Sequence, residues 1–395
     1  MQNNISNFTY FNPTKVVFGK NQISTLDQLI PSNKKVLITY GGGSVKRFGT
    51  LDKVKQALGD RVYGEFGGIE ANPTFETAMK AVELVKKEGY DFLLAVGGGS
   101  VIDATKFIVA AAEFEGDPIN IFGSGIGTSE PIKSALPFGT ILTLPATGSE
   151  MNAGSVITFK EKQAKVSFGS EKVFPVFSIL EPELTYTLPK RQLANGVIDA
   201  FVHIMEQYLT FPVGAMVQDR FSEGLLQTLI EIGPDVIDET NKDYNLRANF
   251  MWTATNALNG TLSPGVPQDW ASHDLGHEIT ALYHIDHART LSIVLPALLT
   301  VRKNEKYDKL LQYAERVWQI TEGTDEEKVT GAIEKTKEFF ARLGAPTSFK
   351  DIDLGEEVID ILVTQLESHK KIALSERKDQ TIEISRKIYQ AALIE

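Results

Sequence analysis

The sequence contains no cysteine among its 395 residues. This absence excludes disulfide bonds, a thiol nucleophile, iron–sulfur clusters and thiolate-bound zinc. Any metal ion that the protein binds must therefore be held by nitrogen and oxygen ligands, which histidine and the acidic side chains supply. Histidine is scarce as well, with only six residues, so the way in which the histidines are distributed along the chain becomes informative.

Positive net charge and long apolar runs are also missing. The formal net charge is −11 and the isoelectric point is near 5.2, which argues against nucleic acids and anionic membranes as partners. The most apolar stretch, residues 92–112, contains three glycines, Asp103 and Lys106, so it is not expected to cross a membrane. The first residues lack the basic start and apolar run of a signal peptide. We therefore expect a cytoplasmic protein.

The first half of the chain alternates short β-branched runs with helical patterns. KKVLITY (34–40), DFLLAV (91–96) and GTILTLP (139–145) read as strands, and each ends at a turn rich in glycine or small polar residues. Residues 74–89 form an amphipathic pattern with Thr74 as the N-cap of a helix. Strand, glycine turn, helix and strand in this order are typical of a parallel α/β sheet, and we predict a Rossmann-like nucleotide-binding domain.

The pattern changes near Leu188, after which six segments read as helices. The change falls within EPELTYTLPKRQ (181–192), where two prolines interrupt the chain. We therefore predict two domains, an α/β dinucleotide-binding domain over residues 1–187 and an all-helical metal-binding domain over residues 188–395.

Four of the six histidines fall in one short window, SHDLGHEITALYHIDH, and an Asp–His pair lies upstream in GVIDAFVH. Asp199 and His203 are four residues apart in a helical pattern, so they share one face of that helix. His273 and His277 have the same spacing in a second helical pattern, and His287 follows a short break. Imidazole and carboxylate together are the usual ligands of a divalent transition metal. Spacing alone favours these two pairs as a four-coordinate site, in which His277 is the fourth ligand.

Two glycine loops have the same construction. VGGGSVIDATK (96–106) and YGGGSVKR (40–47) each follow a predicted strand and precede a predicted helix. Glycine lets the backbone approach an oxyanion closely, and a helix N-terminus offers free N–H groups and partial positive charge. Neither loop matches G-x-G-x-x-G, but two such loops, with TGSE at a third strand end, favour a nucleotide crevice.

The first of these loops also bears on the choice of cofactor. Enzymes that prefer NAD usually place a carboxylate near the end of an early strand, where it binds the ribose hydroxyls. Here Tyr40 is followed by three glycines and Ser44, and then by the cations Lys46 and Arg47. Small residues, a hydroxyl and positive charge suit a 2′-phosphate, so we expect NADPH/NADP.

Glycine loops followed by a His/Asp metal site form the layout of the iron-containing (group III) alcohol dehydrogenases. GGIEANP, GGGSVID, TLPATGSEMN, EPELTYTLP and the histidine window resemble the motifs of this family, in the same order and over essentially the whole chain. YGGGSVKR, NGVIDAFVH and GVPQDWASHDLGHE resemble its NADPH-dependent aldehyde reductase/butanol dehydrogenase branch in particular. The resemblance implies a dehydroquinate synthase-like architecture and a homodimer. It also implies hydride transfer between NADP(H) and short- to medium-chain aldehydes or primary alcohols.

The resemblance further implies one divalent metal, Fe²⁺ or Zn²⁺, and its ligands. These are Asp199, His203, His273 and His287, so His287 takes the place that spacing alone gives to His277. In the family, the histidine at the position of His277 lies near the nicotinamide and the substrate. We therefore expect His277 to act in the catalytic pocket as a proton relay, beside the four ligands.

The resemblance also assigns the cofactor-binding residues. Gly97, Gly98, Gly99 and Ser100 would bind the pyrophosphate, while Ser44 and its neighbouring glycines would bind the 2′-phosphate. Thr143, Thr147 and Asn152 would line the cofactor, and Lys165 would reach its ribose. The complete expected set is Gly41, Gly42, Gly43, Ser44, Gly97, Gly98, Gly99, Ser100, Asp103, Thr143, Thr147, Asn152 and Lys165.

Three alternative functions remain at this stage. A dehydroquinate synthase-like lyase would need basic residues around the metal for a phosphorylated substrate, and the metal window offers only Arg289. An NAD-dependent glycerol dehydrogenase-like enzyme would need a carboxylate in the first loop. A non-catalytic module would bind metal and nucleotide without turnover. The substrate pocket is the least defined part of the site, with Trp270, Tyr283 and Phe159 as candidate apolar residues.

Overall fold

A computed structural model describes residues 4–393. The described chain forms two compact units. The first, here called the α/β unit, contains residues 11–188 and 242–251. The second, called the helical unit, contains residues 4–10, 189–241 and 252–393. The predicted division at residues 187/188 differs from this arrangement in two places, because an N-terminal segment lies in the helical unit and residues 242–251 lie in the α/β unit.

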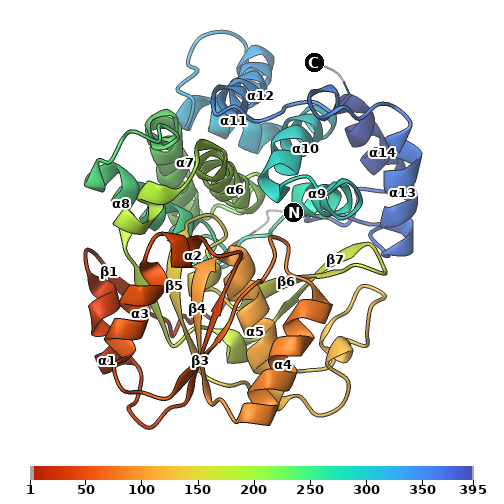
Figure 1. Ribbon diagram of the computed structural model, residues 1–395. Helices are drawn as coiled ribbons and strands as arrows, with labels where there is room; N and C mark the ends of the chain where they lie inside the picture. Colours follow the sequence, from red (N-terminus) through yellow and green to blue (C-terminus); the bar gives the residue numbers. More distant parts are fainter. Residues whose placement is uncertain (1–3, 394–395) are drawn as a thin grey trace. The chain divides into compact units, whose positions relative to one another are not determined.

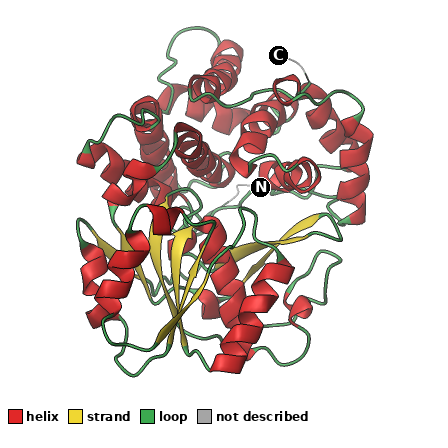
Figure 2. Cartoon of the chain, in the orientation of Figure 1, coloured by secondary structure: helices red, strands yellow, loops and turns green. Residues whose placement is uncertain are grey.

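A six-stranded parallel sheet forms the centre of the α/β unit (Figure 2). Its strand order is β1-β8-β5-β4-β2-β3. The strands are β1 (Lys15–Phe18), β2 (Val36–Tyr40), β3 (Tyr63–Phe66), β4 (Phe92–Gly98), β5 (Phe138–Leu144) and β8 (Phe177–Leu180). An antiparallel hairpin follows β5 and consists of β6 (Gly154–Phe159) and β7 (Ala164–Gly169).

Helices cover both faces of the sheet (Figure 1). They are α1 (Leu26–Leu29), α2 (Ser44–Arg47), α3 (Thr50–Leu58), α4 (Phe75–Glu88) and α5 (Gly99–Glu113). Successive residues of β4 point to opposite faces. Leu93 and Ala95 belong to the core packed against α4 and α5, whereas Leu94 and Val96 belong to the core on the other face. Strands buried on both faces explain why β4 reads as a continuous apolar run.

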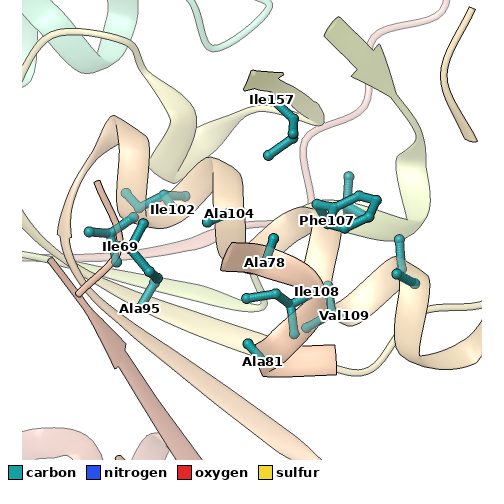
Figure 3. Packing of buried hydrophobic residues seen from close by; sticks show 14 of the residues in the cluster. Ile69, Ala78, Ala81, Ala95, Ile102, Ala104, Phe107, Ile108, Val109 and Ile157 are labelled. Carbon is teal, nitrogen blue, oxygen red and sulfur yellow. The ribbon is translucent and has the colours of Figure 1, made fainter. Parts of the chain in front are cut away.

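Helix α5 is buried along most of its length. Ala104, Phe107 and Ile108 pack with residues of α4 and of the hairpin, including Ala78 and Ile157 (Figure 3). This packing fixes the N-terminus of α5 directly after the last residue of β4. The predicted Rossmann-like arrangement therefore places the second glycine loop at the carboxyl end of a central strand, where such folds bind ligands.

The helical unit has no strand of its own within its described residues. Its helices are α6 (Lys190–Tyr208), α7 (Met216–Val236), α9 (Ala271–Tyr283), α10 (His287–Val301), α11 (Tyr307–Arg316), α12 (Asp325–Arg342), α13 (Val358–Ser368) and α14 (Ile382–Ala391). Helix α8 (Tyr244–Ala257) contributes residues to both units. Across residues 4–393, no helix has the length and apolar character that a membrane crossing requires.

Candidate metal and cofactor sites

The helices α6 and α9 bring three of the predicted metal ligands together. Asp199 and His203 lie one turn apart on α6, and His273 lies near the start of α9. One ligand atom from each residue lies within 4.8 Å of the other two, and all three residues are buried. Oδ1 of Asp199 is 4.0 Å from Nε2 of His203 and 3.9 Å from Nε2 of His273. Asp199 and His203 therefore share one face of α6, as their four-residue spacing predicts.

His277 and His287 both lie beside this group. His287 is the first residue of α10, and its ring centroid is 5.0 Å from that of His273 and 4.7 Å from that of His277. The rings of His273 and His277 are 6.1 Å apart. The two remaining histidines lie apart from this ring cluster. His284 is an exposed C-cap residue of α9, and His369 contacts Glu278 through Nδ1 at 2.9 Å.

Sequence reasoning did not single out Glu206, which orients one of the ligands. Glu206 lies on α6, three residues after His203, and is buried. Its Oε1 accepts hydrogen bonds from the backbone N–H groups of Ser272 (2.7 Å) and His273 (3.2 Å), while its Oε2 contacts Nδ1 of His273. Holding Nδ1 in this way turns Nε2 of His273 toward Asp199, as carboxylates behind metal-binding histidines commonly do.

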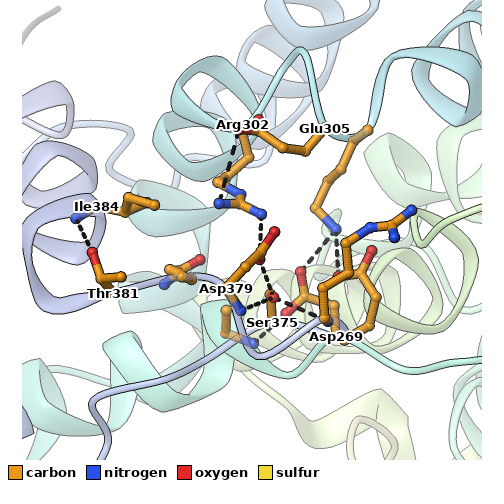
Figure 4. Close-up of polar contacts among 12 residues, drawn as sticks. Asp269, Arg302, Glu305, Ser375, Asp379, Thr381 and Ile384 are labelled. Atoms are coloured by element: carbon orange, nitrogen blue, oxygen red, sulfur yellow. Dashed lines mark hydrogen bonds and ion pairs between the residues drawn. The ribbon is translucent and has the colours of Figure 1, made fainter.

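The start of α9 is anchored by a second buried acid. The N–H of Asp269 donates to the carbonyl of Glu206 at 2.9 Å, and its Oδ1 accepts from the N–H of Ala271 at 2.9 Å. Its Oδ2 pairs with Nζ of Lys306 at 2.8 Å (Figure 4). Burial raises the pKa of Glu206 well above its usual value, and the neighbouring Asp269 adds to this effect. A cation among the histidines would favour the charged forms of these acids.

The residues present fit a divalent metal ion. Oδ1 of Asp199 is buried, yet it accepts no hydrogen bond from any residue in the described part of the chain. A buried carboxylate oxygen without a donor is costly unless a cation faces it. Imidazole nitrogens and carboxylate oxygens are ligands that Fe²⁺ and Zn²⁺ both accept. Asp199, His203 and His273 therefore form the core of a candidate metal centre, with His287 and His277 adjacent.

The three candidate pocket residues occupy different environments. Trp270 lies directly before α9, and its ring centroid is 5.5 Å from that of His273 and 6.2 Å from that of His203. Tyr283 is the half-buried last residue of α9. Phe159 is buried in the core of the α/β unit, where it stacks on Phe75 at 5.1 Å. Trp270 is thus the one of the three that adjoins the candidate metal centre.

The second glycine loop forms the junction between β4 and α5. Gly97 and Gly98 end the strand, and Gly99 begins a helix of 15 residues. A Cβ atom on Gly97 would lie 2.5 Å from Val101, and one on Gly99 would lie 2.5 Å from Oγ1 of Thr147. Side chains are therefore excluded at this junction, and the backbone N–H groups at the start of α5 can approach a phosphate.

The segment after β5 lies against the same junction. Thr143 belongs to β5, while Thr147 packs against Gly99. Burial raises the pKa of the Asp103 carboxyl, and the charges of Lys106 and, to a smaller extent, Lys165 oppose this shift. Asn152 is joined to α5 through Lys106, a fully buried residue that sequence reasoning did not single out as functional. The structure thus brings Thr147, Asn152 and Lys165 near α5.

The first glycine loop lies between β2 and α2. Gly43 adopts a positive φ of 105°, and Ser44 begins the short helix α2. Open space surrounds the Cβ positions of Gly42 and Gly43. Small residues and a hydroxyl therefore form an accessible turn at the end of a strand.

A carboxylate that the sequence did not reveal lies near this loop. Glu65 of β3 accepts a hydrogen bond from the hydroxyl of Tyr40 at 3.0 Å and lies 3.6 Å from Nζ of Lys46. Lys55 also pairs with Glu65. Hydrogen bonding to Lys55 lowers the pKa of Glu65, despite the opposing effect of partial burial. The acid near the first loop is thus already engaged by two cations.

Two known family descriptions together match almost the entire chain. Residues 13–182 match the iron-containing alcohol dehydrogenase family, and residues 193–393 match the C-terminal domain of the Fe-containing alcohol dehydrogenase family. The chain belongs to the iron-containing alcohol dehydrogenase family. The predicted family is confirmed, and with it an enzyme of the oxidoreductase class.

Individual relatives of this alcohol dehydrogenase are similar over most or all of their length. The Escherichia coli protein named NADPH-dependent aldehyde reductase YqhD is 54% identical over 390 residues, which cover 98% of this chain and 100% of the relative. Probable NADH-dependent butanol dehydrogenase 1 of Bacillus subtilis is 44% identical over 364 residues, covering 91% and 92% of the two chains.

Solved structures confirm the predicted fold class. The crystal structure of E. coli YqhD has a TM-score of 0.96 at 54% identity and covers 99% of this chain and 100% of its own. That of NADH-dependent butanol dehydrogenase A from Thermotoga maritima has a TM-score of 0.93 at 35% identity, with 99% and 100% coverage. A parallel α/β sheet followed by a helical region is therefore the architecture of the whole chain.

Proposed function

We propose that this alcohol dehydrogenase reduces short- to medium-chain aldehydes to primary alcohols, and catalyses the reverse oxidation, with NADPH/NADP and one divalent metal ion. The observation that carries the proposal is the convergence of Asp199, His203 and His273 in one buried cluster. The printed names of the similar proteins, an aldehyde reductase and butanol dehydrogenases, support this substrate class over the lyase and glycerol dehydrogenase alternatives.

The preference for NADPH rests on the first glycine loop. Gly41, Gly42, Gly43 and Ser44 contain no carboxylate that would repel a 2′-phosphate. Glu65, the nearby acid, is held by Lys46 and Lys55. Relatives at 44% identity and below include proteins named as NADH-dependent, whereas the relative at 54% is named as NADPH-dependent. The chemistry of the loop and the printed name of the relative at 54% identity thus both favour NADPH.

Asp199, His203, His273 and His287 would hold the metal ion. The bound metal would supply Lewis-acid chemistry at the substrate oxygen, and NADPH would be the source of the hydride. Glu206 would hold the proton of His273 on Nδ1, so that Nε2 would keep its lone pair for coordination. Asp199 supplies the negative charge that partly compensates the divalent cation.

His277 would supply the proton that completes the reduction. Its ring lies 4.7 Å from that of His287, one helical turn after His273. Imidazole exchanges protons near neutral pH, so His277 can donate to the substrate oxygen directly or through water. Trp270, which adjoins the metal ligands, would limit the access of water to the reacting atoms.

The test of this function is NADPH consumption with butanal, measured on protein reconstituted anaerobically with Fe²⁺ or Zn²⁺. We expect turnover with NADPH and metal, and little turnover with NADH. Equal rates with NADH would contradict the 2′-phosphate interpretation while leaving the metal chemistry intact. Bound metal and nucleotide without turnover on any aldehyde would favour the non-catalytic alternative.

We further propose that the enzyme works in the cytoplasm and that it forms a homodimer, as the family resemblance implies. Light scattering coupled to size exclusion would report twice the chain mass of 43.6 kDa for a dimer. Inactivation in air would distinguish Fe²⁺ from Zn²⁺ as the native metal, because only Fe²⁺ is oxidised under these conditions.

A further inference from the structure

Lys106 is a lysine without solvent exposure in the centre of α5. Its ammonium group donates three hydrogen bonds, to Oγ of Ser149 (2.8 Å), to Oδ1 of Asn152 (2.8 Å) and to the carbonyl of Gly154 (2.7 Å). All three acceptors lie within residues 149–154. One side chain thus uses its full donor capacity to hold a single loop against the helix.

Asp103, one turn earlier on α5, binds the same loop from the same side. Its Oδ1 accepts from the hydroxyl of Ser149 at 2.6 Å, and its Oδ2 accepts from the N–H of Val156 at 3.0 Å. Both carboxylate oxygens are therefore used inside the protein. Burial lowers the pKa of Lys106 to about 8, although the charges of Asp103 and Glu150 oppose this shift.

The loop that Lys106 holds is the one expected to line the cofactor. Nδ2 of Asn152 donates to the carbonyl of Thr147 at 3.3 Å, and the hydroxyl of Thr147 accepts from the N–H of Ser149 at 3.2 Å. Thr147 in turn packs against Gly99, the first residue of α5. The position of Lys106 is thereby transmitted through Asn152 and Thr147 to the glycine junction that would receive the pyrophosphate.

We propose that Lys106 is a positioning residue for the cofactor, which holds residues 147–154 in the shape that binds NADPH. The inference rests on the proposed function, because it concerns the cofactor of that same site. Lys106 acts from within the protein through Ser149, Asn152 and Gly154.

The variant Lys106→Met tests this role. It takes one donor from each of three acceptors of the loop. It also removes the cation that opposes the charge of the buried Asp103 carboxyl, and the loss of one partner of a buried charge pair destabilises a fold. We therefore expect a lower melting temperature together with a displaced loop. A positioning role is distinguished from a general loss of stability by hydrogen exchange that increases in residues 147–154 and by a weaker affinity for NADPH.

The experiment compares Lys106→Met with Thr105→Val in the full-length protein. Thr105 is the neighbouring buried residue on α5, and its hydroxyl bonds Thr39 (2.7 Å) and Val101 (2.8 Å) instead of the loop. NADPH affinity is measured by fluorescence titration. Hydrogen exchange of residues 147–154 is measured on the protein without cofactor, and melting temperatures are recorded for both variants.

For Lys106→Met we expect the NADPH dissociation constant to rise about tenfold, the ratio that corresponds to 1.4 kcal/mol. Exchange in residues 147–154 should increase as well. Thr105→Val removes two buried hydrogen bonds and should lower the melting temperature, while the affinity stays within about twofold. Lys106→Gln, which retains donors without the charge, should restore part of the affinity and serves as the second variant if Lys106→Met does not fold.

Unchanged affinity and exchange in Lys106→Met would overturn the positioning role, and so would an equal loss of affinity in Thr105→Val. A wild-type protein that does not bind NADPH would instead contradict the proposed function, so the two failures are distinguishable.

Discussion

At the scale of single residues, metal binding depends on whether His287 or His277 is the fourth ligand. We predict that His287→Ala lowers the bound metal and abolishes activity. His277→Ala should keep the metal and reduce kcat by about 10²- to 10⁴-fold, the usual contribution of a general acid. Metal content by elemental analysis and steady-state kinetics measure the two effects.

His284→Ala is the matched control, since this histidine lies in the same window but is exposed. It should keep both metal and activity. Loss of metal in His277→Ala with retention in His287→Ala would reverse the assignment and restore the set that sequence spacing alone favours.

Glu206 gives a second test at this scale. Glu206→Gln keeps an oxygen for the N–H groups of Ser272 and His273 but can turn an amide N–H toward Nδ1 of His273. The proton of the imidazole would then move to Nε2, where it blocks coordination. We predict metal affinity about 10- to 100-fold weaker, measured by competition with a fluorescent chelator. An affinity equal to that of the wild type would show that Glu206 does not set the tautomer.

The residues that sequence reasoning missed share one physical property. Asp199 and His203 were found because their spacing is local, one turn of one helix. Glu206, Lys106 and Glu65 act on residues of other elements, which only tertiary packing brings near. The apolar stretch around Lys106 could have indicated that this lysine is buried, but only the tertiary structure identifies its hydrogen-bond partners.

At the scale of elements, regular and long patterns were predictable and short ones were not. The helix expected over residues 74–89 is α4, and its predicted N-cap is present, because Oγ1 of Thr74 accepts from the N–H of Thr77 at 3.3 Å. The strands β1, β3, β6, β7 and β8 were missed. Three of them, β1, β3 and β8, have only four residues, which is too short for a distinct periodicity. The hairpin strands β6 and β7 have six residues each and were missed as well.

The cap of α4 provides the prediction for this scale. Thr74→Ala removes the acceptor for a free N–H group of the first turn. We expect the free energy of unfolding to fall by about 1 kcal/mol, measured by urea denaturation followed by circular dichroism. Thr74→Ser retains the hydroxyl and should lose less. Equal losses in the two variants would assign the effect to packing of the methyl group instead of capping.

At the scale of the whole molecule, the sequence pattern predicted two domains with a single boundary at residues 187/188. The two observed units are each built from more than one segment of the chain. Residues 242–251 lie in the α/β unit although they begin a helix, α8, that continues into the helical unit. Helical periodicity indicates that such a segment is a helix but does not indicate which core it packs against. The segment before residue 11 is similar, because the N–H of Ser6 donates to the carbonyl of Gly265 at 3.0 Å, far along the chain.

The distribution of tryptophan makes one unit separately observable. All three tryptophans, Trp252, Trp270 and Trp318, lie in the helical unit, and the candidate metal ligands lie there as well. Tryptophan fluorescence during urea denaturation therefore reports the unit that would bind the metal. A metal ion at a hundred times its dissociation constant stabilises the folded state by about 2.7 kcal/mol if it does not bind the unfolded chain. We predict that Fe²⁺ or Zn²⁺ shifts the fluorescence midpoint to higher urea and that a chelator reverses the shift.

Asp199→Ala should abolish that shift, because it removes the buried carboxylate that faces the ligand nitrogens of His203 and His273. Its midpoint without metal should match or exceed that of the wild type without metal, since Oδ1 of Asp199 is a buried acceptor for which the described chain provides no hydrogen-bond donor. A metal-induced shift that persists in Asp199→Ala would place the stabilising ion elsewhere in the molecule. A midpoint that does not respond to metal in the wild type would contradict a metal centre in the helical unit.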